Sequence, residues 1–222
     1  MPIVEDFYLL AHDERGKPRL HTRATAIGLA AGVLAELLLT GHITVADTYV
    51  TPAVASVDGA GRPRQYSPPP DPLGHTVYDQ ICHEPRRHPV RTWLSVLAPT
   101  ITESVAVRLD RIGVLHVVEV GRIRKTTRHQ PVDPDAGTKV KVVLAARLIR
   151  HDPTIDWPDA VLAGLLAATG LISEVLWQDT TGAGHYYLGH LLKQTTHQLP
   201  SLAALFADTE AAIGDAVLTH RT

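Results

Sequence analysis

Hydrophobic residues fill one stretch of the chain on every side of a helical wheel. From Thr25 to Thr40 the sequence reads TAIGLAAGVLAELLLT, and Glu36 is its single charged residue. A helix that is apolar all round must be buried. Its roughly sixteen residues would reach about 24 Å, which is short of the roughly 30 Å hydrocarbon layer of a membrane. We therefore predict a central core helix that ends at Gly41, and not a membrane span.

Period-two alternation of apolar and polar residues predicts strands in two regions. The first region follows Gly41 and is interrupted by turn residues and then by prolines, which cannot join a regular element. It predicts strands at residues 43–50 and 53–57, a turn at 58–61 and an irregular surface connection at 62–74. The second region predicts a β-hairpin, with strands at residues 114–120 and 122–128 and a turn near Gly121.

The other periodic segments predict helices. One of them, residues 160–169, is apolar all round like the core helix and ends at Gly170. The first, residues 3–10, is predicted to be a short amphipathic helix followed by a turn at residues 13–17. The remaining helices are predicted at residues 77–83, 90–97, 101–112, 139–150, 172–177, 186–196 and 202–219. The fold class is therefore mainly α, with amphipathic helices packed around buried apolar ones.

Composition is that of an ordinary globular protein. A chain of 222 residues with 45% hydrophobic content can bury one good core, so one domain over residues 1–222 is the default. Cys82 is the only cysteine, which excludes an internal disulfide and any site with several cysteine ligands. The first ten residues, MPIVEDFYLL, lack the basic region of a signal peptide. We expect a cytoplasmic protein.

Positive charge is concentrated in a few places. The formal net charge is −2, from 21 basic and 23 acidic residues. The second predicted hairpin strand nevertheless carries four basic residues and no acid, namely Arg122, Arg124, Lys125 and Arg128. A second cluster leads into the core helix and contains Arg15, Lys17, Arg19, His21 and Arg23, and a third contains Arg86, Arg87, His88 and Arg91. Such clusters can attract phosphate groups, and each basic side chain near an anionic membrane contributes about 1 kcal/mol to membrane binding. They can also be ordinary solvated surface, where a salt bridge contributes about 0–1 kcal/mol to folding stability.

No motif for catalysis, nucleotide binding or metal binding is present. HExxH, GxxxxGK[ST] and GxSxG are all missing from the sequence. His185 and His190 are separated by about 140° on a helix at 3.6 residues per turn, so they do not share a face. We expect no catalytic residues, no metal and no cofactor. A helix at residues 101–112 followed by a basic hairpin is the order of elements in a winged helix, which leaves DNA binding as an alternative. In that arrangement the acidic residues Glu103 and Asp110 would face the DNA phosphates. Nucleic acid is therefore not the expected partner.

Several longer segments share their order and spacing with one protein family. They are GLAAGVLAELLLTGHITV at residues 28–45, LDRIGVL at 109–115, TTRHQPVDP at 126–134 and DPTIDWPDAVLAGLLAATGLISEVL at 152–176. Over nearly its whole length the chain resembles the Golgi phosphoprotein 3 family, which includes bacterial members. The resemblance implies a single, mostly α-helical domain with a buried central helix bundle and a projecting β-hairpin.

The resemblance also implies a function at the membrane. Eukaryotic members are peripheral membrane proteins and not known as catalysts. They bind phosphatidylinositol 4-phosphate through a basic pocket on a flat face, beside a hairpin that can enter the bilayer, and act as adaptors for membrane enzymes. In this chain the tryptophan of that pocket falls on His21, and its three arginines fall on Ala30 and near Pro99 and Thr102, so none of the four is matched.

The hypothesis from the sequence is a non-enzymatic peripheral protein on the inner face of the membrane. It would bind anionic phospholipid headgroups, of the phosphatidylinositol 4-phosphate type, through a basic face, and serve membrane-protein clients as an adaptor. The residues predicted to hold the headgroup are Arg19, His21, Arg23, Arg122, Arg124, Lys125 and Arg128. The alternative is that the hairpin serves self-association into a homo-oligomer without lipid binding.

Overall fold

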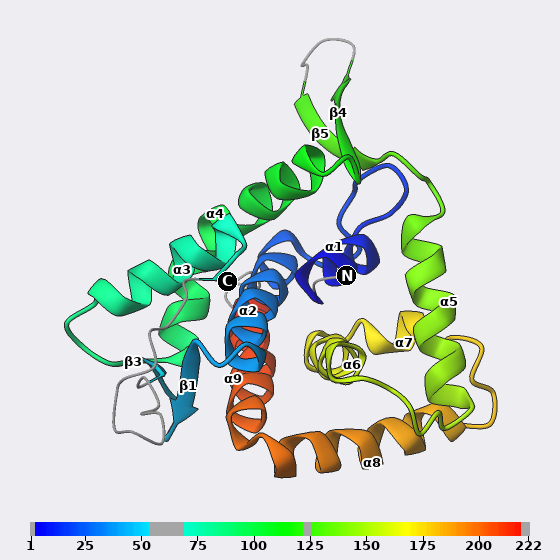
Figure 1. Cartoon of the computed structure of the whole chain (residues 1–222). Helices are drawn as coiled ribbons and strands as arrows, with labels where there is room; N and C mark the ends of the chain where they lie inside the picture. Colours follow the sequence, from blue (N-terminus) through cyan, green and yellow to red (C-terminus); the bar gives the residue numbers. More distant parts are fainter. Residues whose placement is uncertain (1–2, 54–68, 122–125, 219–222) are drawn as a thin grey trace.

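The structure, a computed structural model, describes residues 3–53, 69–121 and 126–218 (Figure 1). Its helices are α1 (Ile3–Ala11), α2 (Thr22–Leu39), α3 (Pro72–His83), α4 (Val90–Arg111), α5 (Ala136–Ile149), α6 (Trp157–Thr169), α7 (Ile172–Val175), α8 (Ala183–Gln198) and α9 (Pro200–Leu218). Its strands are β1 (Ile43–Ala46), β2 (Tyr49–Pro52), β3 (His88–Pro89), β4 (Leu115–Val120) and β5 (Thr126–Pro131). The predicted mainly α fold is confirmed.

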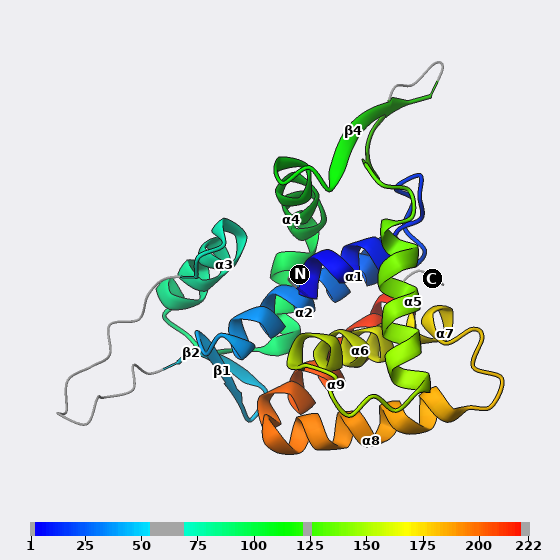
Figure 2. The ribbon, with the colours of Figure 1, turned by 45° about the vertical axis from the view of Figure 1, so that its right-hand side comes forward.

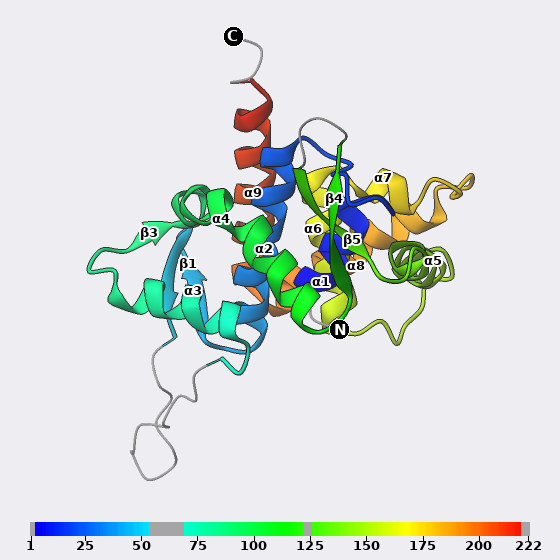
Figure 3. The same cartoon turned by 90° about the horizontal axis from the view of Figure 1, so that it is seen from above.

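The predicted core helix is α2, at the centre of the structure. It packs against α1, α3, α4, α6 and α9 (Figures 1 and 3). Its length and composition would suffice to cross a membrane, but 78% of it is buried inside the protein. Gly41 ends it as predicted, in the left-handed conformation with φ of 71°. The amide of His42 then donates to the carbonyl of Leu37 over 2.9 Å, which satisfies an otherwise orphaned carbonyl of the last turn.

The second all-apolar helix, α6, is also buried and ends at Gly170 as predicted. The first helix, α1, was predicted to be amphipathic, but in the structure it has no solvent-exposed face. It lies between α2, α4, α5 and α6, so every residue in it except Asp6 is buried. Even Glu5 is only 4% exposed. A buried carboxylate needs a charged or hydrogen-bonding partner to offset its lost hydration.

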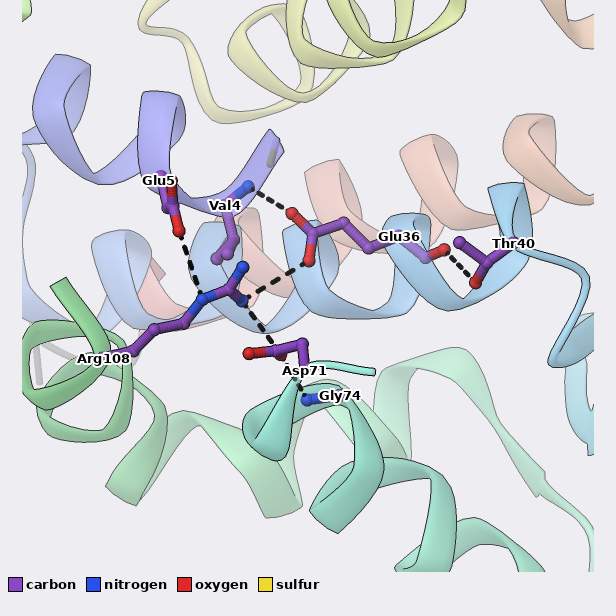
Figure 4. A network of polar contacts seen from close by, with 7 residues as sticks. All are labelled: Val4, Glu5, Glu36, Thr40, Asp71, Gly74 and Arg108. Carbon is purple, nitrogen blue, oxygen red and sulfur yellow. Dashed lines mark hydrogen bonds and ion pairs between the residues drawn. The ribbon is translucent and has the colours of Figure 1, made fainter. Parts of the chain in front are cut away.

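Arg108 supplies that partner and joins four helices (Figure 4). Its Nε lies 3.2 Å from Oε1 of Glu5, and its Nη1 lies 3.0 Å from Oδ2 of Asp71. Glu36, the one charge of α2, lies with Oε2 3.7 Å from the same Nη1. The other oxygen of Glu36 accepts a 2.9 Å hydrogen bond from the backbone amide of Val4. Burial raises the pKa of Glu36 to about 6, with Arg108 opposing the shift.

The first small sheet is more compact than predicted. The single strand predicted at residues 43–50 is the hairpin β1–β2, which turns at Asp47 and Thr48 with φ of 50° and 68°. A short β3 pairs with β2. The second strand predicted at residues 53–57 does not include residue 53, and the rest of it lies outside the described residues, as do the turn at 58–61 and the connection up to residue 68. The connection ends earlier than predicted because Pro72 starts α3, where a missing amide proton costs nothing.

Two predicted helices form the single helix α4. Pro99 lies inside it and was expected to separate residues 90–97 from 101–112. The carbonyl that Pro99 leaves without a helical partner belongs to Ser95, and both residues are exposed, so water can satisfy that group. The segment that a winged helix would place in a DNA groove is therefore the second half of a long helix that packs on α2.

A β-hairpin is present as predicted and projects from the helical body (Figures 1 and 2), but its second strand, predicted at residues 122–128, is β5 at Thr126–Pro131 and so continues three residues further. Its strands pair from Leu115 opposite Pro131 to Val120 opposite Thr126. Arg128 lies on β5 opposite Val118. The other basic residues predicted for this hairpin, Arg122, Arg124 and Lys125, lie outside the described residues.

Candidate functional site

Two basic regions that are far apart in the sequence lie side by side in the structure. The turn at residues 13–17 packs against β5, where Nε2 of Gln130 donates to the backbone oxygen of Arg15 over 3.4 Å. Gly16 sits at the contact with φ of 68°, and a side chain there would collide with the carbonyl of His129. The approach thus requires glycine. It brings the basic segment before α2 next to the strand that carries Arg128.

His21 and Arg23 lie at a cavity of about 780 Å³. The cavity forms where the start of α2, the middle of α4 and the end of α9 meet, an arrangement seen from above in Figure 3. His21 is the N-cap residue of α2, and its Nδ1 accepts a 3.3 Å hydrogen bond from the amide of Arg23. The walls between the charged residues are formed by small or apolar side chains, namely Ala26, Ile27, Ala98, Pro99 and Ala212.

The charged groups of this cavity are unequally compensated. Arg91 forms an ion pair with Asp215. Glu103, which also lines the cavity, faces the hairpin, with Oε1 3.5 Å from Nε2 of His129. The guanidinium of Arg23, in contrast, has no carboxylate partner among the described residues. The cavity therefore presents the Arg23 guanidinium outside any ion pair within the described residues, beside apolar walls and next to β5, while Glu103 balances its charge, so that the lining as a whole is formally neutral.

Arg19 does not join this cavity. Its Nε donates to the carbonyl of His12 over 3.2 Å, and the residue lines a second cavity of about 320 Å³ together with Lys141 and Trp177. The predicted headgroup residues that the structure describes are therefore divided. His21 and Arg23 share the first cavity, Arg128 is on the adjacent strand, and Arg19 is elsewhere. Arg91 was recognised only as part of a basic cluster, because nothing in the sequence placed it opposite α2.

Three of the four positions on or near which the family's pocket residues fall lie at the first cavity. His21, Pro99 and Thr102 all line it, although they come from separate parts of the sequence. Ala30 is fully buried within α2 and does not reach it. A family model for Golgi phosphoprotein 3 (GPP34) matches residues 3–207.

The chain belongs to the Golgi phosphoprotein 3 (GPP34) family. The matched range includes every described element from α1 to the first part of α9, and thus the hairpin strands, the second cavity, and the first cavity apart from Ala212 and Asp215. No curated protein matches the chain. Within the described ranges, no group of three or more histidine, cysteine, aspartate or glutamate residues could hold a metal ion.

Proposed function

We propose that this GPP34-family protein is a non-enzymatic peripheral membrane protein that binds anionic phospholipid headgroups in the cavity between α2, α4 and α9. The observation that carries the proposal is the position of His21, Pro99 and Thr102. The family's tryptophan falls on His21 and two of its arginines fall near Pro99 and Thr102, and these three residues line one cavity of about 780 Å³. This supports a headgroup site at the same place in the fold, formed by residues that differ from those of the family pocket.

Arg23 is the cation best placed to bind a phosphate in this cavity. It is exposed, and its guanidinium has no carboxylate partner among the described residues. A guanidinium forms charge-assisted, often bidentate, hydrogen bonds with phosphate oxygens. Because alanine, proline and threonine replace the arginines of the family pocket, we propose a preference for negative charge in general over one particular phosphoinositide. His21 would add a hydrogen bond beside it.

The hairpin extends this surface toward the lipid. Arg128 on β5 and the basic turn that packs against β5 lie next to the cavity wall formed by Glu103. Val117 on β4 is 51% exposed, which suits contact with the region between headgroups and acyl chains. We propose that the hairpin and the cavity meet the inner face of the membrane together, and that the bound protein serves membrane-protein clients as an adaptor.

Vesicle flotation tests the proposal. The protein should float with vesicles that contain phosphatidylglycerol at low salt, be released at high salt, and ignore vesicles of pure phosphatidylcholine. Arg23→Glu should weaken binding about tenfold or more, because each basic side chain near an anionic surface is worth about 1 kcal/mol. Arg150→Glu is the control, because Arg150 is exposed at the end of α5 and does not line the cavity. This variant, with the same change in charge, should bind like the wild type. A protein that ignores strongly anionic vesicles even at low salt would refute the proposal.

A second candidate function is self-association through the hairpin. It is favoured by the projection of β4 and β5 from the body, where in the described part of the chain the two strands pair only with each other (Figure 2). Open strand edges can pair with those of another copy. Reversing the charges of Arg122, Arg124 and Arg128 distinguishes the two functions. The change should release lipid under the first and lower the sedimentation mass under the second.

A further inference from the structure

We propose that the second cavity, between α1, α5 and α7, binds a small organic anion whose phosphate or carboxylate group is attached to a flat apolar body. The cavity measures about 320 Å³ and is lined by Arg19, Lys141 and Trp177. It is a different cavity from the proposed headgroup site, so this inference goes beyond the proposed function. Figure 1 shows α7 beside α5, with the end of α1 nearby.

Two cations reach this cavity from separate parts of the chain. Arg19 is held by the hydrogen bond from its Nε to the carbonyl of His12, which leaves its two terminal nitrogens to act as donors. Neither Arg19 nor Lys141 forms an ion pair within the described ranges. Glu174 is the one acidic residue of the lining, so the cavity has a net positive charge of one.

Trp177 provides a flat wall beside these charges. Its side chain is 65% exposed, which is unusual for the largest apolar side chain and is typical of a binding surface. Lys141 lies over the indole, with Nζ 5.5 Å from the ring centroid. This cation–π contact orients the ammonium group toward the space in front of the ring. An anion bound there would contact Lys141 and place its attached apolar group against the indole.

The floor of the cavity suits such a ligand. It consists of apolar side chains from three elements, namely Leu9, Leu10, Leu171 and Val175. Gly137 lets the start of α5 approach α1 closely, since a side chain at that position would lie 2.6 Å from the carbonyl of Leu9. Gly137 and Thr138, in the first turn of α5, also line the cavity, and the N-cap residue of α5 makes no capping bond through its side chain. The first-turn amides add to the positive potential that Arg19 and Lys141 create.

The experiment uses phenyl phosphate as the probe and the three tryptophan indole N–H signals of the full chain as the readout. Trp177→Phe assigns the signal of Trp177. Titration should give a saturable shift of that signal and leave those of Trp93 and Trp157 nearly unchanged, whereas phenol, which lacks the phosphate, should give none. Absence of a saturable Trp177 shift, or an equal shift with phenol, would overturn the proposal.

Variants identify the charges that act. Lys141→Gln and Arg19→Gln should each weaken phenyl phosphate binding about tenfold, as expected for loss of one charge-assisted hydrogen bond. Glu174→Gln should tighten binding about threefold or more, because it removes the opposing charge. This gain cannot come from misfolding. Arg150→Gln, at the exposed end of α5, should leave binding unchanged. Equal affinities for the wild type, Lys141→Gln and Glu174→Gln would also overturn the proposal.

Flotation with phosphatidylglycerol vesicles identifies the source of the anion. If Lys141→Gln lowers both vesicle binding and phenyl phosphate binding, the natural ligand is a lipid headgroup. If it lowers only phenyl phosphate binding, the ligand is a soluble aryl or acyl anion. Failure of the proposed membrane function would appear as no flotation of the wild type, and the shift of the Trp177 signal would still decide this inference.

Discussion

Asp71 accepts two different donors that join α3 to α4. Its Oδ2 lies 3.0 Å from Nη1 of Arg108 and also accepts a 2.7 Å hydrogen bond from the amide of Gly74. The carboxylate therefore caps the start of α3 and forms an ion pair with α4 at the same time. Since Arg108 also contacts Glu5 and Glu36, one guanidinium holds the relative positions of α1, α2, α3 and α4.

Replacing this guanidinium should strongly destabilise the fold. We expect Arg108→Met to lower the free energy of unfolding by about 3–5 kcal/mol, because the buried carboxylate of Glu5 and the half-buried ones of Glu36 and Asp71 would lose their common partner. The side chains of Arg108 and Glu5 are only 14% and 5% exposed, so water cannot replace the lost contact. Urea unfolding of the two proteins measures the effect. Arg111→Met, at an exposed position one turn later on α4, should change stability by less than about 0.5 kcal/mol. Similar losses for both variants would contradict the role given to Arg108.

The carboxylate of Glu36 should make stability depend on pH. Burial raises the pKa of Glu36 from 4.5 to about 6 in the folded protein. The folded state therefore binds the proton more tightly than the unfolded chain. The stabilisation from this group is complete below about pH 4.5 and is lost as the pH rises through about 6.

Glu36→Gln removes this titration and isolates its contribution. At pH 4.5 the variant and the wild type should have similar stability, because glutamine resembles protonated glutamate. At pH 7 the variant should be the more stable by on the order of 2 kcal/mol, as a shift of one pKa unit corresponds to about 1.4 kcal/mol. Urea unfolding at both pH values gives the difference, with the exposed change Glu14→Gln as control. A difference that does not grow with pH would show that Arg108 compensates Glu36 fully.

The sequence was sufficient for the core and insufficient for the site. The helix α2 could be predicted because no face of its wheel is polar, so burial was its only stable environment. Because of Pro99, α4 was predicted as two helices. The free-energy cost of a proline inside a helix depends on whether the carbonyl that loses its partner can bind water, and this depends on the tertiary structure. The prediction that the basic residues form one site was also limited by tertiary structure. Arg19 and His21 are two residues apart and belong to one basic cluster in the sequence. The structure nevertheless places them in different cavities, because the chain changes direction there to begin α2.

Close packing of α1 on α2 gives a third prediction, with an internal contrast between two glycines. A side chain at Gly28 would lie 2.7 Å from Cε1 of Phe7, which is fully buried. Gly28→Ala should therefore lower the free energy of unfolding by about 1–3 kcal/mol through overpacking. A side chain at Gly189 on α8 would meet nothing within 4 Å. Gly189→Ala should raise stability by about 0.5–1 kcal/mol, because alanine favours the helix. Thermal unfolding of both variants tests the contrast, and equal effects would contradict it.

The hairpin yields the last prediction, which separates membrane contact from folding. Val117 on β4 and Val143 on α5 are 51% and 54% exposed, so replacing either by serine should cost less than about 0.5 kcal/mol of stability. Only Val117 lies on the hairpin that we propose to meet the lipid. Val117→Ser should weaken binding to phosphatidylglycerol vesicles about fivefold, since a buried methylene is worth about 0.8 kcal/mol. Val143→Ser should bind like the wild type. The ratio of the two affinities, those of the wild type and Val117→Ser, should stay the same as the salt concentration rises within the range where the wild type still binds, because transfer of an apolar group out of water is not screened by salt. If both valine variants bind equally well, the hairpin does not enter the interface, and the membrane contact must be confined to the cavity.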